Sequence, residues 1–213
     1  MKTFASFSDI APGGKNRDWT VWPDSCWLLS RRPLYIPPFP GGIRLFPCLA
    51  LKTGRLGKSI APKFAHRYFA EYAPALLLVP VEALSLLDRG LTPPAPLLCF
   101  DNAIVLGDWA PLPESADCGP NEVRASSLPH SKFYIHHSNL NAPLLAQADL
   151  SRPLDLIVQV SAANTVKTGD IFLLPLSNPA FPLEININDH IEMDCASSIA
   201  DPNRRAPLST NFK

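Results

Sequence analysis

Short apolar segments, separated by prolines, glycines and polar turns, recur along the chain and predict a protein rich in strands. Segment 44–52 is the clearest, because its side chains alternate as on a strand with two different faces. The two sets of side chains are Leu45, Pro47, Leu49 and Leu51 against Phe46, Cys48 and Ala50. Further strands are predicted at 1–8, 75–81, 103–106 and 132–139, with a penultimate strand from 171 and a closing hairpin at 183–192.

Three segments have the apolar spacing of helices. The first is 59–72, with Pro62 near its start, where proline is tolerated. The others are 82–90, which ends at Gly90, and 153–164. The chain has 24 prolines and only 10 glycines, and since proline fixes φ and lacks an N–H, this excludes a helix bundle. The predicted fold class is α+β and β-rich, with a few short helices.

A chain of 213 residues can bury one sizeable hydrophobic core. We predict a single domain over residues 1–200 and an irregular tail over residues 201–213, which contains two prolines and two adjacent arginines. The polar segment 110–131 is predicted to be a surface excursion.

Charge and cysteine content limit the classes of function. The 19 basic and 19 acidic residues give no net charge, so we expect neither a nucleic-acid partner nor membrane binding, and self-association is favoured. The five cysteines include no Cys-x-x-Cys pair, which indicates reduced thiols. The first residues lack a signal-peptide core, and the longest apolar run, 73–81, is too short to span a bilayer. We therefore expect a soluble cytoplasmic protein.

Three segments together carry a resemblance to a known family. They are residues 44–58, the Lys-Phe-Ala-His-Arg-Tyr sequence at 63–68 and the Lys-Thr-Gly-Asp sequence at 167–170. The chain resembles the fumarylacetoacetate hydrolase family, in particular its short single-domain members from Bacteroidetes-type bacteria. This resemblance implies a mixed β-sheet roll or barrel. For an active member it also implies Mg²⁺- or Mn²⁺-dependent hydrolysis of a C–C bond in a 2,4-diketo acid.

The positions at which the family binds its metal carry no carboxylates here. In the family, one strand holds two glutamates two residues apart and a later strand holds an aspartate. The resemblance places these positions at Phe46, Cys48 and Leu77. Mg²⁺ and Mn²⁺ prefer oxygen ligands, which these side chains do not offer. No Asp or Glu occurs between Asp24 and Glu71, so a small shift of the alignment does not restore the two glutamates.

The family's other functional positions are changed as well. The His and Glu of its water-activating dyad correspond to Gly13 and Asn16, neither of which can act as a general base. Its substrate-site positions correspond to four further residues, Asp9, Leu98, Leu174 and Ser177. Asp9 and Ser177 are also typical of ordinary turns.

These changes predict a catalytically inactive family member without a cofactor, which acts through binding or through pairing as a homodimer or with an active paralogue. A second hypothesis is an Mg²⁺- or Mn²⁺-dependent hydrolase, or a related isomerase or decarboxylase, with replacement ligands among Asp9, Glu71, Glu82 and Asp101. A third is a metal-free small-molecule binding module that uses the former active-site cleft, lined by Phe46, Leu77, Leu98 and Leu174.

Some single residues also suggest chemistry, but the pattern favours structural roles for them. His66 lies in the segment 63–68, which supports structure in the family. His136 and His137 are neighbours on a predicted strand, so they point to opposite faces and cannot share one ion. Cys48 as a nucleophile lacks an assignable His or cation beside it. Asp101 is typical of a turn or cap.

Overall fold

The computed structural model describes residues 1–10, 19–112, 132–140, 142–146, 148–149, 151–196 and 205–213. Its strands are β1 (Lys2–Ser6), β2 (Trp19–Pro23), β3 (Trp27–Leu29), β4 (Pro33–Leu34), β5 (Ile43–Thr53), β6 (Phe69–Pro80), β7 (Ile104–Leu106), β8 (Ala110–Pro111), β9 (Lys132–His137), β10 (Leu144–Ala146), β11 (Ile171–Pro175), β12 (Leu183–Glu184), β13 (His190–Ala196) and β14 (Arg205–Phe212). Its helices are α1 (Val81–Asp88) and α2 (Ser151–Ala163), with the 3₁₀ helices η1 (Phe7–Asp9), η2 (Asp24–Cys26), η3 (Pro62–Tyr68) and η4 (Ala95–Leu97).

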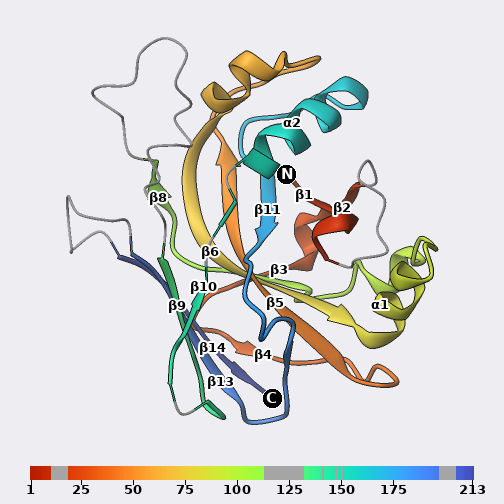
Figure 1. Ribbon diagram of the computed structural model, residues 1–213, viewed down its shortest axis with the longest axis vertical. Helices are drawn as coiled ribbons and strands as arrows, with labels where there is room; N and C mark the ends of the chain where they lie inside the picture. Colours follow the sequence, from red (N-terminus) through yellow and green to blue (C-terminus); the bar gives the residue numbers. More distant parts are fainter. Residues whose placement is uncertain (11–18, 113–131, 141, 147, 150, 197–204) are drawn as a thin grey trace.

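The strands form two mixed sheets (Figure 1). The larger has the order β2-β1-β11-β5-β6-β7-β3, with β12 paired to β5 and β8 paired to β6. Within it β1 and β11 run parallel, whereas β5 is antiparallel to both β11 and β6. The smaller sheet has the order β10-β9-β13-β14-β4, and its strands β13 and β14 contact β6. This arrangement confirms the predicted β-rich fold class with mixed sheets and short helices.

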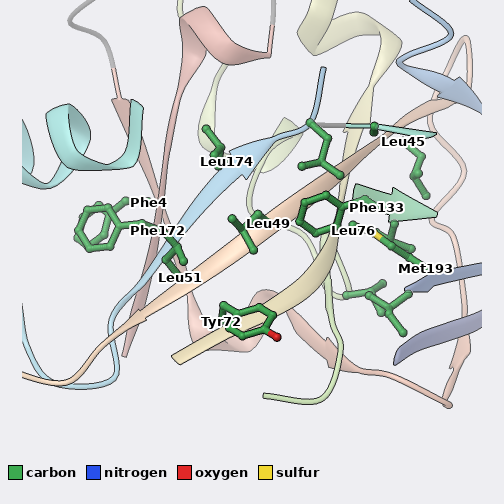
Figure 2. Packing of buried hydrophobic residues seen from close by; sticks show 14 of the residues in the cluster. Phe4, Leu45, Leu49, Leu51, Tyr72, Leu76, Phe133, Phe172, Leu174 and Met193 are labelled. Atoms are coloured by element: carbon green, nitrogen blue, oxygen red, sulfur yellow. The ribbon is translucent and has the colours of Figure 1, made fainter. Parts of the chain in front are cut away.

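The long antiparallel pair β5–β6 separates two apolar cores. The first core, part of which Figure 2 shows, combines residues of both sheets: Leu45, Leu49 and Leu51 of β5, Tyr72 and Leu76 of β6, Phe172 and Leu174 of β11, and Phe133 and Met193 of the smaller sheet. The second core takes the other face of the pair: Phe46, Cys48 and Ala50 of β5 with Ala73, Ala75 and Leu77 of β6. The alternation predicted along 44–52 is therefore confirmed.

The prediction of an irregular tail over residues 201–213 is wrong from residue 205 onward. Strand β14 covers Arg205–Phe212 and pairs with both β13 and β4. Leu208 and Phe212 are each 1% exposed and belong to the first core. The segment looked irregular because its few apolar residues are interspersed with polar ones, but their spacing of two or four residues suits one face of a strand.

Two further predicted elements differ in the structure. The helix expected at 59–72 is only the 3₁₀ helix η3, and β6 begins at Phe69 because that part of the chain pairs with β5. The hairpin expected at 183–192 does not form, since β12 pairs with β5 whereas β13 pairs with β9 and β14. The helices expected at 82–90 and 153–164 are confirmed as α1 and α2. Residues 113–131 of the expected excursion lie outside the described residues.

A buried carboxylate fastens the first strand to the Lys-Thr-Gly-Asp turn. Asp170 is 0% exposed. Its Oδ1 accepts a hydrogen bond from the backbone N–H of Lys2 at 3.0 Å, and its Oδ2 accepts one from the backbone N–H of Lys167 at 2.9 Å. The Lys2 ammonium lies 3.8 Å from Oδ2. The turn needs Gly169, whose φ of 88° lies in the left-handed region.

Candidate functional site

The three positions that the sequence resemblance aligns with the family's metal ligands lie close together in the structure. Phe46 and Cys48 lie two residues apart on one face of β5, and Leu77 of β6 is the direct cross-strand partner of Phe46. All three belong to the second core. Side chains on one face of directly paired residues have Cβ atoms about 5 Å apart. The fold therefore gathers these positions as a metal site would require.

An apolar layer covers these three positions, which are themselves between 0% and 6% exposed. Phe7, Ile10, Trp22 and Leu98 belong to the same core, and each is at most 5% exposed. The indole Nε1 of Trp22 donates a hydrogen bond to the carbonyl oxygen of Leu98 at 2.8 Å, so the tryptophan is fixed over the sheet with its polar atom satisfied. This part of the molecule is a buried apolar core.

A hard divalent cation does not fit this group of side chains. Mg²⁺ takes oxygen ligands in an octahedral arrangement, whereas Phe46 and Leu77 have no ligand atom. The Sγ of Cys48 donates a hydrogen bond to the carbonyl oxygen of Phe46 at 3.2 Å. Across the described part of the chain, no group of three or more His, Cys, Asp or Glu side chains could hold a metal ion.

Among the carboxylates considered as replacement ligands, the three whose side chains the structure describes do not converge. Glu71 lies near the start of β6, where it forms an ion pair with Lys52, whereas Glu82 follows the far end of that strand. At about 3.3 Å per strand residue, the length of β6 separates them by roughly 30 Å. Asp101 is exposed in a turn whose next residue, Asn102, has a φ of 65°. The expected turn role of Asp101 is confirmed.

The substrate-site positions are divided between different parts of the molecule. Leu98 belongs to the second core, whereas Leu174 belongs to the first, because its β11 register pairs it with Leu49. Ser177 is exposed beyond β11. The predicted cleft lined by Phe46, Leu77, Leu98 and Leu174 is therefore wrong, since Leu174 points to the opposite face of the sheet from the other three. Gly13, Asn16 and the side chain of Asp9 lie outside what the structure describes; the backbone of Asp9 ends η1.

The histidine pair does not converge either. His136 is exposed, whereas His137 is 7% exposed, so the two point to opposite faces as predicted. His137 Nδ1 accepts a hydrogen bond from the backbone N–H of Asn139 at 3.3 Å, and its Nε2 lies 3.2 Å from Asp189 Oδ2 but outside hydrogen-bonding geometry. The interactions among His137, Asn139 and Asp189 stabilise the turn that follows β9. His66 is half-buried in η3.

A third histidine has a perturbed pKa with a clear cause. His190 Nε2 lies 3.0 Å from Glu192 Oε1, and Nδ1 lies 2.8 Å from Asn211 Oδ1. The hydrogen bond to Glu192 is the main reason that the pKa of His190 is raised above its usual value of 6.5. Because the folded pKa is the higher one, the stabilisation is fully present below pH 6.5 and is lost as the pH rises through the folded value.

We expect Glu192→Gln to lower the pKa of His190 in an NMR titration of the imidazole. Glu184→Gln, which removes a carboxylate that forms an ion pair with Arg44 in the larger sheet, is the matched control and should leave that pKa unchanged. Because both His190 and Glu192 are more than a third exposed, the effect on stability should be only about 0.3 kcal/mol. An unchanged pKa in Glu192→Gln would contradict the assigned cause.

The thiols have environments that disfavour nucleophilic chemistry. Burial, followed by the neighbouring thiol of Cys99, raises the pKa of Cys26 to about 11. Burial also raises the pKa of Cys99. Cys48 is 0% exposed, so a substrate cannot reach its sulfur without opening the second core. A reactive cysteine needs a low pKa and an accessible sulfur, and none of these three combines both.

Sequence reasoning missed a polar cluster at the end of the same face. Lys52 and Glu71 are direct cross-strand partners and form an ion pair, and Lys52 Nζ lies 4.3 Å from the centroid of the Trp109 ring. The opposite charges close one end of the second core, beyond Ala50 and Ala73. The sequence signal for this cluster was the position of the two charges: Lys52 follows the apolar part of β5, and Glu71 precedes the apolar part of β6.

No protein-family model and no curated protein sequence matches the chain. Solved structures match it over almost its entire length. A protein assigned to the fumarylacetoacetate hydrolase family, from Yersinia pestis CO92, is 16% identical with a TM-score of 0.73, and the match covers 100% of this chain and 92% of that one. The 5-carboxymethyl-2-hydroxymuconate delta-isomerase of Mycobacterium smegmatis is 15% identical with a TM-score of 0.68, covering 99% and 76%. The maleylpyruvate hydrolase of Sphingobium sp. SYK-6 is 16% identical with a TM-score of 0.67, covering 99% and 70%.

The matched proteins share their architecture with this chain but little of their sequence. The TM-scores of 0.67–0.73 establish a common fold, whereas identities of 15–16% leave the chemistry to be argued from the side chains. The two-sheet arrangement and its match over the whole chain agree with the fold that the sequence resemblance implied. The chain has the fold of the fumarylacetoacetate hydrolase family.

Proposed function

We propose that the chain is a catalytically inactive member of the fumarylacetoacetate hydrolase family, which acts by binding or by pairing with a second copy of itself or with an active paralogue. One observation carries this proposal. The three positions expected to hold metal-binding carboxylates lie together, and they are Phe46, Cys48 and Leu77 in a buried apolar core.

The chemistry of the second core supports the proposal. A metal-dependent hydrolase needs oxygen ligands for its cation and a concave site that admits substrate. Here Phe46 and Trp22 belong to the same apolar core, and both are buried. Apolar side chains also remove a physical problem, because adjacent ionised carboxylates without a cation repel one another and lose their hydration. The core is therefore suited to a fold that is stable without a metal.

The two alternatives receive less support. A replacement metal centre would need its carboxylates to meet, but Glu71 and Glu82 lie at opposite ends of β6. A binding module in the former cleft would need an open space, but its proposed apolar lining is buried and Leu174 faces the other way. Neither arrangement offers a place for a substrate or ligand at the described residues.

Calorimetric titration of the chelator-treated protein with Mn²⁺ and then Mg²⁺ tests the loss of the metal site. We expect no saturable binding up to millimolar concentration, and no metal-dependent cleavage of an acylpyruvate by the same sample. Light scattering of that sample should give a mass above that of the 23.3 kDa chain, because pairing is part of the proposal. One-to-one metal binding accompanied by turnover would overturn the assignment as inactive, and a purely monomeric mass would overturn self-pairing.

A further inference from the structure

A compact loop at the junction of β5 and β6 differs in charge from the rest of the protein. We call residues 54–68 the basic loop. The backbone N–H of Gly54 donates to the carbonyl oxygen of Tyr68 at 2.8 Å, so the two ends of the loop meet. Surface loops of this length with joined ends are compact and are often functional. In Figure 1 the loop lies at the end of β5 and β6, beside α2.

Hydrogen bonds hold the basic loop in a fixed shape against its neighbours. Gly57 and Val166 exchange two backbone hydrogen bonds of 2.9 Å each. Ser161 on α2 accepts from the backbone N–H of Ile60 through its Oγ at 2.9 Å, and from that of Ser59 through its carbonyl oxygen at 2.8 Å. Ile60 and Ala65 are buried beneath the loop. The exposed side chains of this loop are therefore carried by a backbone that is held in place by hydrogen bonds and buried residues.

The exposed charge of the basic loop is of one sign. It carries Arg55, Lys58, Lys63 and Arg67, all exposed, and contains no Asp or Glu, although the whole chain has no net charge. None of these four forms an ion pair with another described residue. The neighbouring turn adds the exposed Lys167. On α2, Arg152 forms an ion pair with the preceding Asp149 at 3.3 Å, and Asp155 is also exposed.

Two apolar side chains are exposed among these cations. Leu56 is 69% exposed and lies between Arg55 and Lys58 in the sequence. Phe64 is 39% exposed, with Lys63 Nζ 4.9 Å and Arg67 Cζ 5.0 Å from the centroid of its ring. Exposed leucine is unfavourable in water, and it gains nothing from a purely ionic partner. Apolar side chains next to cations, Leu56 in the sequence and Phe64 through its ring contacts, are suited to a surface that is anionic outside and apolar beneath its charged layer.

We propose that the basic loop is a peripheral docking surface for anionic lipid bilayers. Lys58, Lys63 and the two arginines would lie among the lipid phosphates, while Leu56 and Phe64 enter the boundary between headgroups and acyl chains. No described helix is long and apolar enough to cross a membrane, and surface docking does not require one. An RNA or an acidic peptide would use the cations and leave Leu56 in water, so the aliphatic side chain favours the bilayer.

Co-sedimentation of the full chain with vesicles tests the proposal. The probes are phosphatidylcholine vesicles and mixed phosphatidylcholine–phosphatidylglycerol vesicles, each at low and high salt. We expect binding only to the anionic vesicles, with loss at high salt because the ionic contacts are screened. Lys58→Gln/Lys63→Gln should weaken partitioning by about fivefold per cation. Leu56→Ser should weaken it by about tenfold.

Matched substitutions separate the loop from general charge and hydrophobicity. Arg89→Gln/Lys213→Gln removes the same charge elsewhere, and Leu91→Ser removes another exposed leucine; both should bind as the unaltered protein does. Absence of binding to anionic vesicles at low salt would overturn the proposal, as would equal losses in the control variants or an unaffected Leu56→Ser. Retention on RNA or polyglutamate without vesicle binding would also overturn it. None of these results depends on the proposed loss of catalysis, because the loop shares no residue with the second core.

Discussion

Asp170→Ala is expected to lower the free energy of unfolding by about 3–5 kcal/mol. The substitution removes a fully buried carboxylate that accepts backbone hydrogen bonds from Lys2 and Lys167 and lies beside the Lys2 ammonium. Alanine would leave the part-buried backbone N–H groups of Lys2 and Lys167 without this acceptor. It would also loosen the connection between β1 and the turn that precedes β11.

Urea unfolding followed by circular dichroism measures this effect. Asp155→Ala, which removes an exposed carboxylate from α2, is the matched control and should change stability by less than about 0.5 kcal/mol. The stability loss of Asp170→Asn should lie between those of Asp155→Ala and Asp170→Ala. The asparagine amide keeps one acceptor oxygen, but its NH₂ group faces a backbone donor. A loss below about 1 kcal/mol for Asp170→Ala would show that the interactions of this carboxylate do not stabilise the fold as argued.

Leu77→Asp, which introduces a carboxylate where the sequence resemblance places the family's third metal ligand, is expected to destabilise the fold by about 4 kcal/mol or more. Leu77 is 0% exposed and packs directly across from Phe46. A single aspartate there would have no counterion and no partner carboxylate, so Mn²⁺ should not restore stability. Because burial favours the protonated form, the loss should be smaller at acidic pH than at neutral pH.

The control for this experiment is Leu91→Asp, the same substitution at a leucine that is 46% exposed. It should remain within about 0.5 kcal/mol of the unaltered protein at both pH values. If Leu77→Asp were equally harmless, the second core would have to contain space or water at that position. Rescue of Leu77→Asp by Mn²⁺ would mean that other oxygen ligands already lie nearby.

Alternation along 44–52 was sufficient to predict the two faces of β5. Once Phe46 and Cys48 share a face, only the register of the next strand decides whether Leu77 joins them, and the family resemblance supplied that register. For Leu174 the same reasoning failed. Every residue of β11 is buried, so no polar position marks its faces, and a shift of one residue exchanges them.

Long-range pairing explains the remaining differences. The strand β14 is stable because it pairs with β13 and β4 on either side. A local sequence pattern cannot predict the pairing with β4, which lies more than 170 residues earlier in the chain. The segment predicted as a helix at 59–72 contains good helix positions, but Phe69 onward extends the pairing with β5 instead. The basic loop was missed for another reason: a net charge of zero conceals an uneven distribution of charge.

The attachment of β1 to β11 has a consequence for synthesis in the cell. Asp170 and Lys2 are separated by 168 positions in the chain, and β1 pairs in the sheet with β11 and β2. The strand β1 can pair with β2 soon after both leave the ribosome, but its second partner, β11, exists only once most of the polypeptide has been made. Such distant contacts slow folding. Phe4, which stacks on Phe172 in the finished protein, is an apolar surface that a nascent chain must protect until then.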